Sequence, residues 1–274
     1  MISRGVRPVR LLSALISLVP ASLFFGADEP SFTEQQKIDF MQHAKVINST
    51  QAKKGKTNPS VLTLSDGTVT HLAGFQPVHE TKPVMQFAGG RTETNFKDFW
   101  EYNVAGYRIA KFLGLDDMVP VYTERKWNGR RGSISWWVPD VQFDEADRVK
   151  RGLRAPDVDA WNRQMHKVRL MTELFYDSDP NLTNVLITKD WKIWRIDFSR
   201  DFRTYDTLPD PKDLVEIERP LWARLRTLNF DQVADATKPY LTKGEVKALM
   251  ARRDKIVALF DKMIAEKGEN QVLY

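Results

Sequence analysis

Short runs of alternating apolar and polar residues characterise the first half of the chain, whereas the second half repeats apolar residues at helical spacing. In the first half, two pairs of β-branched or aromatic runs flank an Asp-Gly or an Asn-Gly dipeptide, a pattern typical of β-hairpins. After Pro139 the pattern predicts helices, interrupted by one short hairpin. The three hairpins are expected at residues 61–64 with 69–72, 120–127 with 132–138, and 185–188 with 192–196.

Capping residues and apolar spacing predict four helices. Thr33 and Gln36 match the capping-box pattern, which predicts a helix that ends near Ile47 and is followed by a polar loop over residues 48–60. The last helix begins with the same pattern at Thr242 and ends before a glycine. The four helices are expected at residues 33–47, 95–113, 161–175 and 242–267.

The N-terminal segment, residues 1–27, resembles a secretory signal, because a short basic stretch precedes 17 residues without charge. Phe25 is a poor residue for a cleavage site that ends at Ala27, so the segment is expected either to be removed or to remain as a single anchor. We therefore expect an exported protein that is periplasmic, extracellular or anchored with residues 28 onward outside, and that meets a membrane only through an uncleaved N-terminal segment. A misassigned start or a buried helix is the alternative.

The composition is that of a globular protein, with 274 residues, 42% of them hydrophobic, and no cysteine. These values exclude disordered, collagen-like and polytopic membrane proteins, and they exclude disulfide frameworks and thiolate metal sites. The net charge of +5 includes three arginines that precede Asp28, and 38 basic residues remain against 36 acidic ones. No nucleic-acid partner is expected from so balanced a surface.

The candidate chemistry lies between Asp177 and Asp197. Asp179 and Asn184 form a D-x-x-x-x-N element after a predicted helix, and the second strand of the short hairpin ends at Asp197. Phosphoryl transfer uses such a set: one carboxylate positions the acceptor hydroxyl, while an amide oxygen and a second carboxylate hold metal ions at the nucleotide phosphates. A lone D-x-x-x-x-N is more often a turn, but the helix, the hairpin and the Ile196-Asp197-Phe198 sequence make the pattern specific.

These elements resemble the protein-kinase-like fold in its atypical branches, namely the HipA kinases, the phosphoinositide kinases and the secretory-pathway kinases. The resemblance implies an α+β, bilobal fold: a small β-rich lobe with one key helix in residues 28–138, and a larger, mainly helical lobe in residues 139–274. It also implies that Asp179 is the catalytic aspartate and that Asn184 and Asp197 bind Mg²⁺ or Mn²⁺ together with ATP or a related nucleotide.

Two positions in the small lobe depart from that pattern. Where these families have a lysine for the phosphates and a glutamate that holds it, this chain has Gln76 and Asn103. Asn103 lies on an apolar helix face, so its amide needs a partner, and Gln76 is the expected one. In the alternative alignment, Lys82 or Arg91 supplies the charge and Glu101 pairs with it. The resemblance further implies a nucleotide-binding hinge at Trp137 and Val138, while for Trp136 and Trp137 a place in the hinge and a place in the core both remain open.

Two functions remain open at this point. The first is an exported kinase-like phosphotransferase, or a nucleotidyl transferase that uses the same site, acting on an acceptor that is a protein or a small molecule. The second is a catalytically inactive, pseudokinase-type binding module for a nucleotide, a sugar phosphate or a protein. The three acidic and amide residues of the second half favour the enzyme, whereas the missing lysine and glutamate favour the binding module.

Overall fold

The computed structural model describes residues 32–51, 59–87, 90 and 92–274, and residues 33–274 form one compact unit. Its secondary structure mixes helices and antiparallel sheets, which confirms the predicted α+β class. The α-helices of the described residues are α1 (Glu34–His43), α2 (Glu101–Leu113), α3 (Glu145–Lys150), α4 (Val158–Phe175), α5 (Arg219–Thr227), α6 (Phe230–Thr237) and α7 (Lys243–Lys267). The strands are β1 (Lys45–Gln51), β2 (Ser60–Ser65), β3 (Thr70–Gln76), β4 (His79–Gln86), β5 (Thr92–Phe99), β6 (Tyr122–Trp127), β7 (Arg130–Trp136), β8 (Val141–Asp144), β9 (Val185–Thr188) and β10 (Ile193–Arg195).

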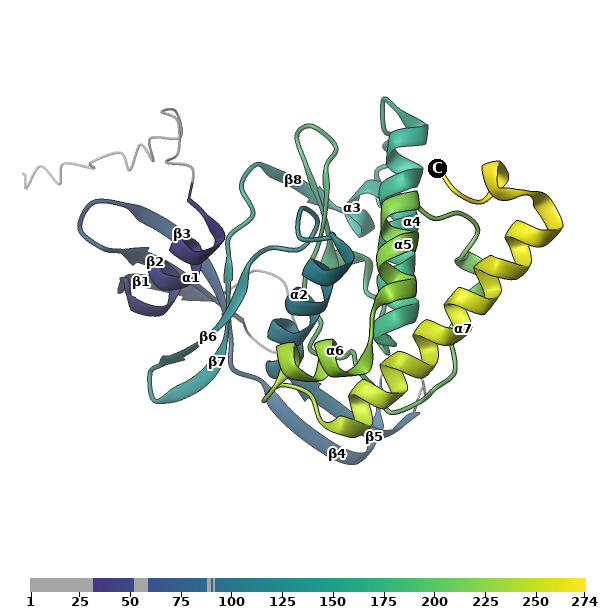
Figure 1. Cartoon of the computed structure of the whole chain (residues 1–274). Helices are drawn as coiled ribbons and strands as arrows, with labels where there is room; N and C mark the ends of the chain where they lie inside the picture. Colours follow the sequence, from purple (N-terminus) through teal and green to yellow (C-terminus); the bar gives the residue numbers. More distant parts are fainter. Residues whose placement is uncertain (1–31, 52–58, 88–89, 91) are drawn as a thin grey trace, which may run out of the picture. The chain divides into compact units, whose positions relative to one another are not determined.

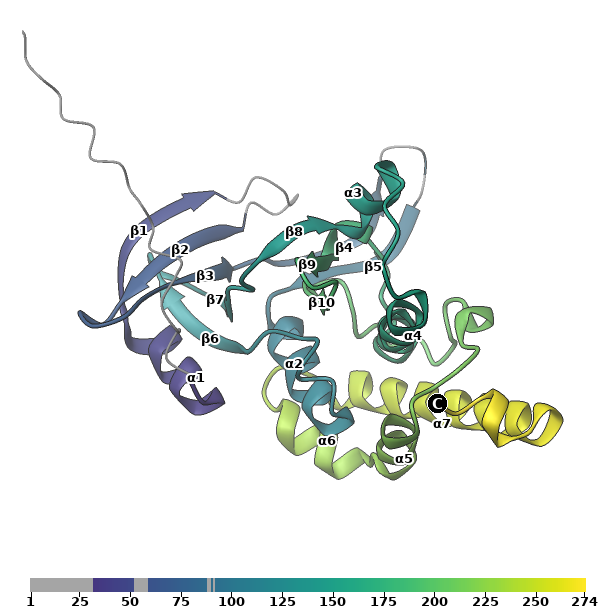
Figure 2. The same cartoon turned by 90° about the horizontal axis from the view of Figure 1, so that it is seen from above.

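The first half of the described chain builds a five-stranded antiparallel sheet in the order β1-β2-β3-β7-β6 (Figures 1 and 2). It contains both predicted hairpins, β2–β3 and β6–β7. The β2–β3 turn forms because the Asp66 carboxylate accepts hydrogen bonds from the Thr68 and Val69 N–H groups, both at 2.8 Å. Strands β3 and β7 join the two hairpins, with Gln76 paired to Ser133 at the end of the ladder. This pairing fixes where Gln76 lies.

The prediction for residues 33–60 was wrong in part. Thr33 and Gln36 form the expected capping box, but α1 ends at His43, and residues 45–51 form β1 instead of helix and loop. Strand β1 pairs with β2 through its backbone, while its side chains are mostly exposed and polar. Because an exposed edge strand needs no apolar alternation, the side-chain pattern does not reveal it.

The helix predicted from Asn95 begins later, at Glu101, since residues 92–99 form β5. Strand β5 pairs with β4 in a two-stranded ribbon that is separate from the other sheets. Its inward residues, Phe96 and Asp98, alternate with more exposed ones, so this segment has the period of a strand. Residues 92–99 form a strand because their backbone pairs with β4, and no strand was predicted for β4.

Helix α2 lies between the five-stranded sheet and the helices of the second half (Figures 1 and 2). It contacts β6 and β7 on one side and α5 and α6 on the other. Its apolar residues, with those of α4, α5 and α7, form the main hydrophobic core. The helix ends at Gly114, whose φ of 68° is in the left-handed region that glycine adopts readily.

The second half contains the predicted hairpin, β9–β10, and the predicted helices, α4 and α7. The expectation that no strand directly follows Pro139 was wrong, because β8 pairs with β9 and makes a three-stranded sheet in the order β10-β9-β8. Within the described residues, no helix has both the length and the apolar character needed to cross a membrane.

Candidate functional site

Asn184 and Asp197, the two predicted metal-binding residues, lie at the same end of the β9–β10 hairpin. The Asn181 side chain accepts a hydrogen bond from the Thr183 N–H at 3.0 Å, and its carbonyl accepts one from the Asn184 N–H at 2.9 Å. This turn leads directly into β9. The Asn184 carbonyl then accepts from the Ile196 N–H at 3.0 Å. The backbone therefore places Asn184 opposite the residue that precedes Asp197, as the sequence predicted.

Asp197 is held in an uncommon backbone conformation. Its φ is 59°, in the left-handed region, which few residues other than glycine adopt. Its N–H donates to the Tyr122 hydroxyl at 3.3 Å, and its Oδ1 accepts from the Ser199 N–H at 3.3 Å and from Gln76 Nε2 at 3.4 Å. Residues in such conformations concentrate at functional sites, where the surrounding structure holds them in place.

A buried ion pair joins the two chain segments of the site. Arg195 Nη2 lies 2.5 Å from Asp177 Oδ2, and both side chains are almost fully buried. Arg195 Nη1 also donates to the Ile196 carbonyl and, at 3.2 Å, to the Asp197 carbonyl. Burial disfavours the charge of Arg195, but Asp177 and the neighbouring acids raise its pKa above the usual value. This ion pair was not predicted from the sequence. The feature that could have revealed it is an arginine on the buried face of a strand, because such an arginine needs a partner.

Asp179, the predicted catalytic residue, is bonded to this pair and is more exposed than either of its members. Its N–H donates to Asp177 Oδ1 at 2.8 Å, which ties it to the buried ion pair. The Asp179 side chain is 32% exposed, and its Oδ2 lies 3.5 Å from Arg200 Nη1. Glu93 of β5, a residue that the sequence analysis did not identify, binds Arg200 at 2.5 Å and Arg203 at 2.8 Å. The ribbon β4–β5 therefore reaches Arg200, the ion-pair partner of Asp179, through Glu93.

The predicted amide pair of the small lobe is present and connects directly to Asp197. Asn103 Nδ2 donates to Gln76 Oε1 at 2.6 Å and to the Ser133 hydroxyl at 3.0 Å. Asn103 Oδ1 accepts from the Phe198 N–H at 2.6 Å. Since Gln76 Nε2 contacts Asp197, the two amides form a closed network with the segment that carries the candidate metal ligand. Asn103 is only 1% exposed, so these bonds are shielded from water.

Phe198 packs against α2 at a position where the helix has no side chain. A Cβ atom at Gly106 would lie 2.8 Å from Phe198 Cγ, which is too close for any real contact. The Phe198 ring is fully buried and packs edge-to-face with Phe175, at a centroid distance of 5.7 Å. The close approach of α2 thus fixes both the backbone and the ring of the residue after Asp197.

The alternative alignment of the small lobe is not supported where the structure describes it. Lys82 Nζ pairs with Glu80 Oε1 at 2.6 Å, on the same strand. Glu101 binds His79 Nδ1 at 2.9 Å. Arg91 lies outside the described residues. Neither Lys82 nor Glu101 therefore takes the place of Gln76 and Asn103 beside Asp197.

The two predicted hinge residues differ in exposure. Trp137 is 40% exposed, whereas Val138 is buried. Trp136 belongs to the core beneath the five-stranded sheet, because its ring is buried, stacks on His71 at a centroid distance of 3.7 Å and contacts Phe40. Of the two tryptophans, Trp137 is the one with a surface to offer a ligand.

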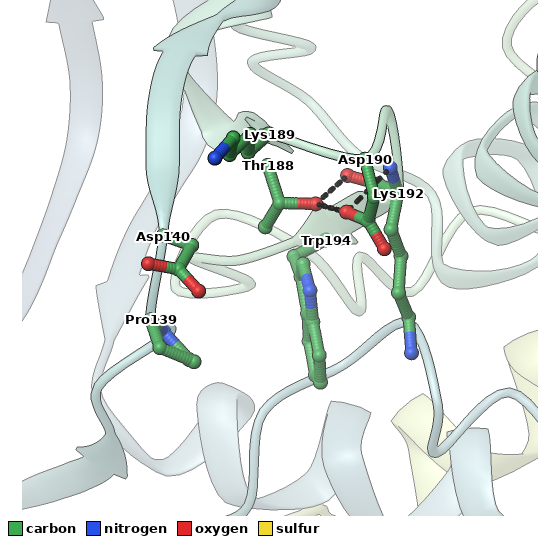
Figure 3. Close-up of a pocket in the computed structure, with 7 residues that line it drawn as sticks. All are labelled: Pro139, Asp140, Thr188, Lys189, Asp190, Lys192 and Trp194. Carbon is green, nitrogen blue, oxygen red and sulfur yellow. Dashed lines mark hydrogen bonds between the residues drawn. The ribbon is translucent and has the colours of Figure 1, made fainter. Parts of the chain in front are cut away.

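A pocket of about 560 Å³ opens directly after Val138, next to the β9–β10 turn (Figure 3). The indole of Trp194 stands opposite Pro139 and Asp140, and Lys192 covers its other side, with Nζ 4.7 Å from the ring centroid. Trp194 is on β10, the strand that ends two residues before Asp197. This pocket was not predicted from the sequence. It is lined by Pro139, Asp140, Thr188, Lys189, Asp190, Lys192 and Trp194.

Asn184 and Asp197 can hold a divalent cation only if a bound ligand supplies further oxygen atoms. No group of three or more His, Asp or Glu residues positioned to hold a metal occurs in the described part of the chain. Asn184 and Asp197 supply an amide oxygen and a carboxylate, and Mg²⁺ commonly takes one or two carboxylates and completes its shell with substrate phosphates and water. In addition, Asp98 of β5 has a buried carboxylate oxygen, Oδ1, without a hydrogen-bond partner among the described residues. These residues fit a cation that arrives with phosphate groups.

The chain has an atypical kinase-like fold. The structure of hydra Fam20 with sugar is similar to it with a TM-score of 0.64, at 13% identity over 88% of this chain and 91% of that chain. The Golgi casein kinase with Mn/ADP bound is similar with a TM-score of 0.62, at 10% identity over 88% of this chain and 78% of that chain. The proinflammatory kinase CtkA from Helicobacter pylori has a TM-score of 0.50, at 9% identity over 82% of this chain and 97% of that chain.

No family model matches the sequence, and no curated protein matches it. At identities of 13% or less, the structural likeness shows the fold alone. The function of the chain therefore depends on the residues of the site and not on the fold alone.

Proposed function

We propose that this protein is a kinase-like phosphotransferase that uses a nucleotide and a divalent cation, Mg²⁺ or Mn²⁺. The observation that carries the proposal is the position of Asn184 and Asp197 at one end of the β9–β10 hairpin, with Asp179 held nearby by Asp177. The Golgi casein kinase of similar fold has Mn/ADP bound. ATP or a related nucleotide is the proposed donor, and the acceptor is a protein or a small molecule with a hydroxyl group.

Each residue has a distinct part in this proposal. Asp179 accepts a hydrogen bond from the acceptor hydroxyl and orients it toward the γ-phosphoryl group. The bond from phosphorus to the hydroxyl oxygen would form as the bond to the leaving nucleoside diphosphate breaks, and Asp179 would take the hydroxyl proton. Asn184 and Asp197 would hold the cation, which would neutralise charge on the phosphates. Gln76 keeps Asp197 in place with its amide but adds no positive charge. Trp137, Val138 and the adjoining pocket with Trp194 accommodate the nucleoside.

Ligand-dependent melting and calorimetry test the proposal. A ligand that binds only the folded protein raises its melting temperature, so ATP with Mg²⁺ or Mn²⁺ should raise it more than either component alone. Asp197→Asn should remove the cation-dependent part of nucleotide binding. Asp206→Asn, a change in an exposed carboxylate that pairs with Lys255, is the control and should bind as the wild type does. Unchanged nucleotide affinity in Asp197→Asn would contradict the proposal.

The second candidate is an inactive binding module of the same fold. The Gln76–Asn103 pair favours it, because two neutral amides stand where a lysine would contact the phosphates. Turnover separates the two functions. If the wild type transfers phosphate to water, to itself or to an added acceptor and Asp179→Asn does not, the protein is an enzyme; nucleotide binding without any transfer indicates the module.

We also propose that the chain is exported. The support is the sequence of residues 1–27, which lie outside the described residues. Fractionation of cells that express the full chain should find the protein outside the cytoplasm, and deletion of residues 1–27 should retain it inside. A full-length protein found in the cytoplasm would contradict export without affecting the proposed chemistry.

A further inference from the structure

Asp98 lies beside the Asp197 segment although it comes from a different part of the chain. It is on β5, and the next residue, Phe99, donates its N–H to the Ser199 carbonyl at 2.9 Å. The Ser199 hydroxyl in turn bonds to the Asp98 carboxylate. Asp98 is also close enough to Asp197 for the two negative charges to act on each other. The ribbon thus brings a second carboxylate to the candidate metal site.

The carboxylate of Asp98 is buried and incompletely bonded. The residue is only 6% exposed, and its Oδ1 has no hydrogen-bond partner among the described residues. Burial raises the pKa of Asp98; the Ser199 hydroxyl lowers it, and the Asp197 charge raises it further. A buried, unpartnered carboxylate oxygen is costly, so native proteins pair such atoms or use them to bind metals.

The neighbouring cations are bound to other carboxylates. Arg200 acts on Asp98 electrostatically, but its terminal nitrogens contact Glu93 and Asp179. Lys82 pairs with Glu80, the cross-strand neighbour of Asp98. Neither pairing satisfies Asp98 Oδ1, so this oxygen is left as an acceptor without a bound cationic group among the described residues.

We propose that Asp98 is a further ligand of the divalent cation, acting with Asp197 and Asn184; this inference rests on the proposed function. Two carboxylates from separate segments then hold the cation, which is the number that Mg²⁺ commonly takes in nucleotide-dependent sites. Glu80 is not a ligand, because its carboxylate is 44% exposed and already paired with Lys82. Cation binding also couples the ribbon β4–β5 to the β9–β10 hairpin.

The test measures Mn²⁺ binding to the full chain, with and without ADP, from the electron paramagnetic resonance signal of free Mn²⁺. Asp98→Asn retains the shape of the side chain and removes the charge, and should weaken Mn²⁺ binding at least tenfold. Glu80→Gln is the matched control on the paired strand and should bind Mn²⁺ as the wild type does. Asp98→Ser is a second, smaller replacement that should reproduce the loss.

Melting temperatures without cation provide an independent readout. Asp98→Asn should melt at or above the wild-type temperature, because it removes an incompletely bonded buried carboxylate, and it should lose most of the stabilisation that Mn²⁺ gives the wild type. If both Asp98 variants melt below the wild type without cation, Asp98 stabilises the fold directly and the inference is wrong.

The remaining outcomes separate this inference from the proposed function. If the wild type binds Mn²⁺ with nucleotide and the Asp98 variants bind it equally well, only the role of Asp98 is refuted. If Glu80→Gln weakens binding as much as Asp98→Asn, the effect is one of general charge, and the inference also fails. If the wild type binds no Mn²⁺ in any condition, both proposals are refuted.

Discussion

The contact between Gln76 and Asn103 can be tested by a double-mutant cycle in unfolding free energy. Asn103→Leu keeps the side-chain size but leaves Gln76 Oε1, the Ser133 hydroxyl and the Phe198 N–H without the Asn103 amide. An unsatisfied buried group costs about 1–3 kcal/mol. Because three groups lose their partner, we expect the unfolding free energy to fall by about 3 kcal/mol or more. Gln76→Met leaves one Asn103 N–H unpaired and removes a donor from Asp197. We expect this change to lower the unfolding free energy by about 2 kcal/mol.

The double variant should be less destabilised than the two single losses together. Each single change leaves the other amide without its partner, and the double change removes both members of that bond. The resulting coupling should be about 1–2 kcal/mol, measured by urea denaturation at 25 °C. Pairing Gln76→Met with Gln164→Met provides the control, since Gln164 bonds instead to the Trp191 carbonyl and the Ile193 N–H. Coupling within about 0.5 kcal/mol of zero in the Gln76–Asn103 cycle would show that the two amides do not interact.

Two further predictions follow from the site and the core. Burial raises the pKa of Glu173 to about 7, so the folded state favours the protonated acid. The stability that this group contributes should be complete below its unfolded pKa of about 4.5 and decline as pH rises to about 7. Glu173→Gln should remove that decline, and parallel pH profiles of the two proteins would refute it. Trp194→Ala should weaken nucleotide binding by about 1–3 kcal/mol, the usual worth of a base stacked on an aromatic ring, as measured by calorimetry; equal affinities would place the base elsewhere.

The parts of the fold that the sequence predicted have strong local signals. Asp66 and Asn128 mark turns that form in the structure, and the capping boxes at Thr33 and Thr242 begin helices as expected. The Gln76–Asn103 contact was predictable for a different reason. This chain has two amides where the resemblance implies a lysine and a glutamate, and a buried amide requires a partner.

The parts that were missed depend on contacts between segments far apart in the chain. Strand β4 is largely polar and exposed, so only its backbone bonds to β5 make it a strand. The positions of Glu93 and Asp98 follow from that pairing, because β5 brings Glu93 to Arg200 and Asp98 to the segment at Ser199. No local pattern distinguishes such a pair of acids from solvated surface charges. The pocket beside Trp194 likewise forms only when the segment after Val138 lies against the hairpin turn.

The attachment of Phe198 to α2 has a mechanical consequence. The helix holds this residue at two points one turn apart, through the Asn103 hydrogen bond and the close packing at Gly106. A shift or rotation of α2 must therefore carry the backbone next to Asp197 with it. The exposed end of the same helix is tied to α1 by the Lys111–Glu34 ion pair. A displacement of that distant end would therefore move α2 as a unit and shift the Asp197 carboxylate, which is proposed to hold the cation.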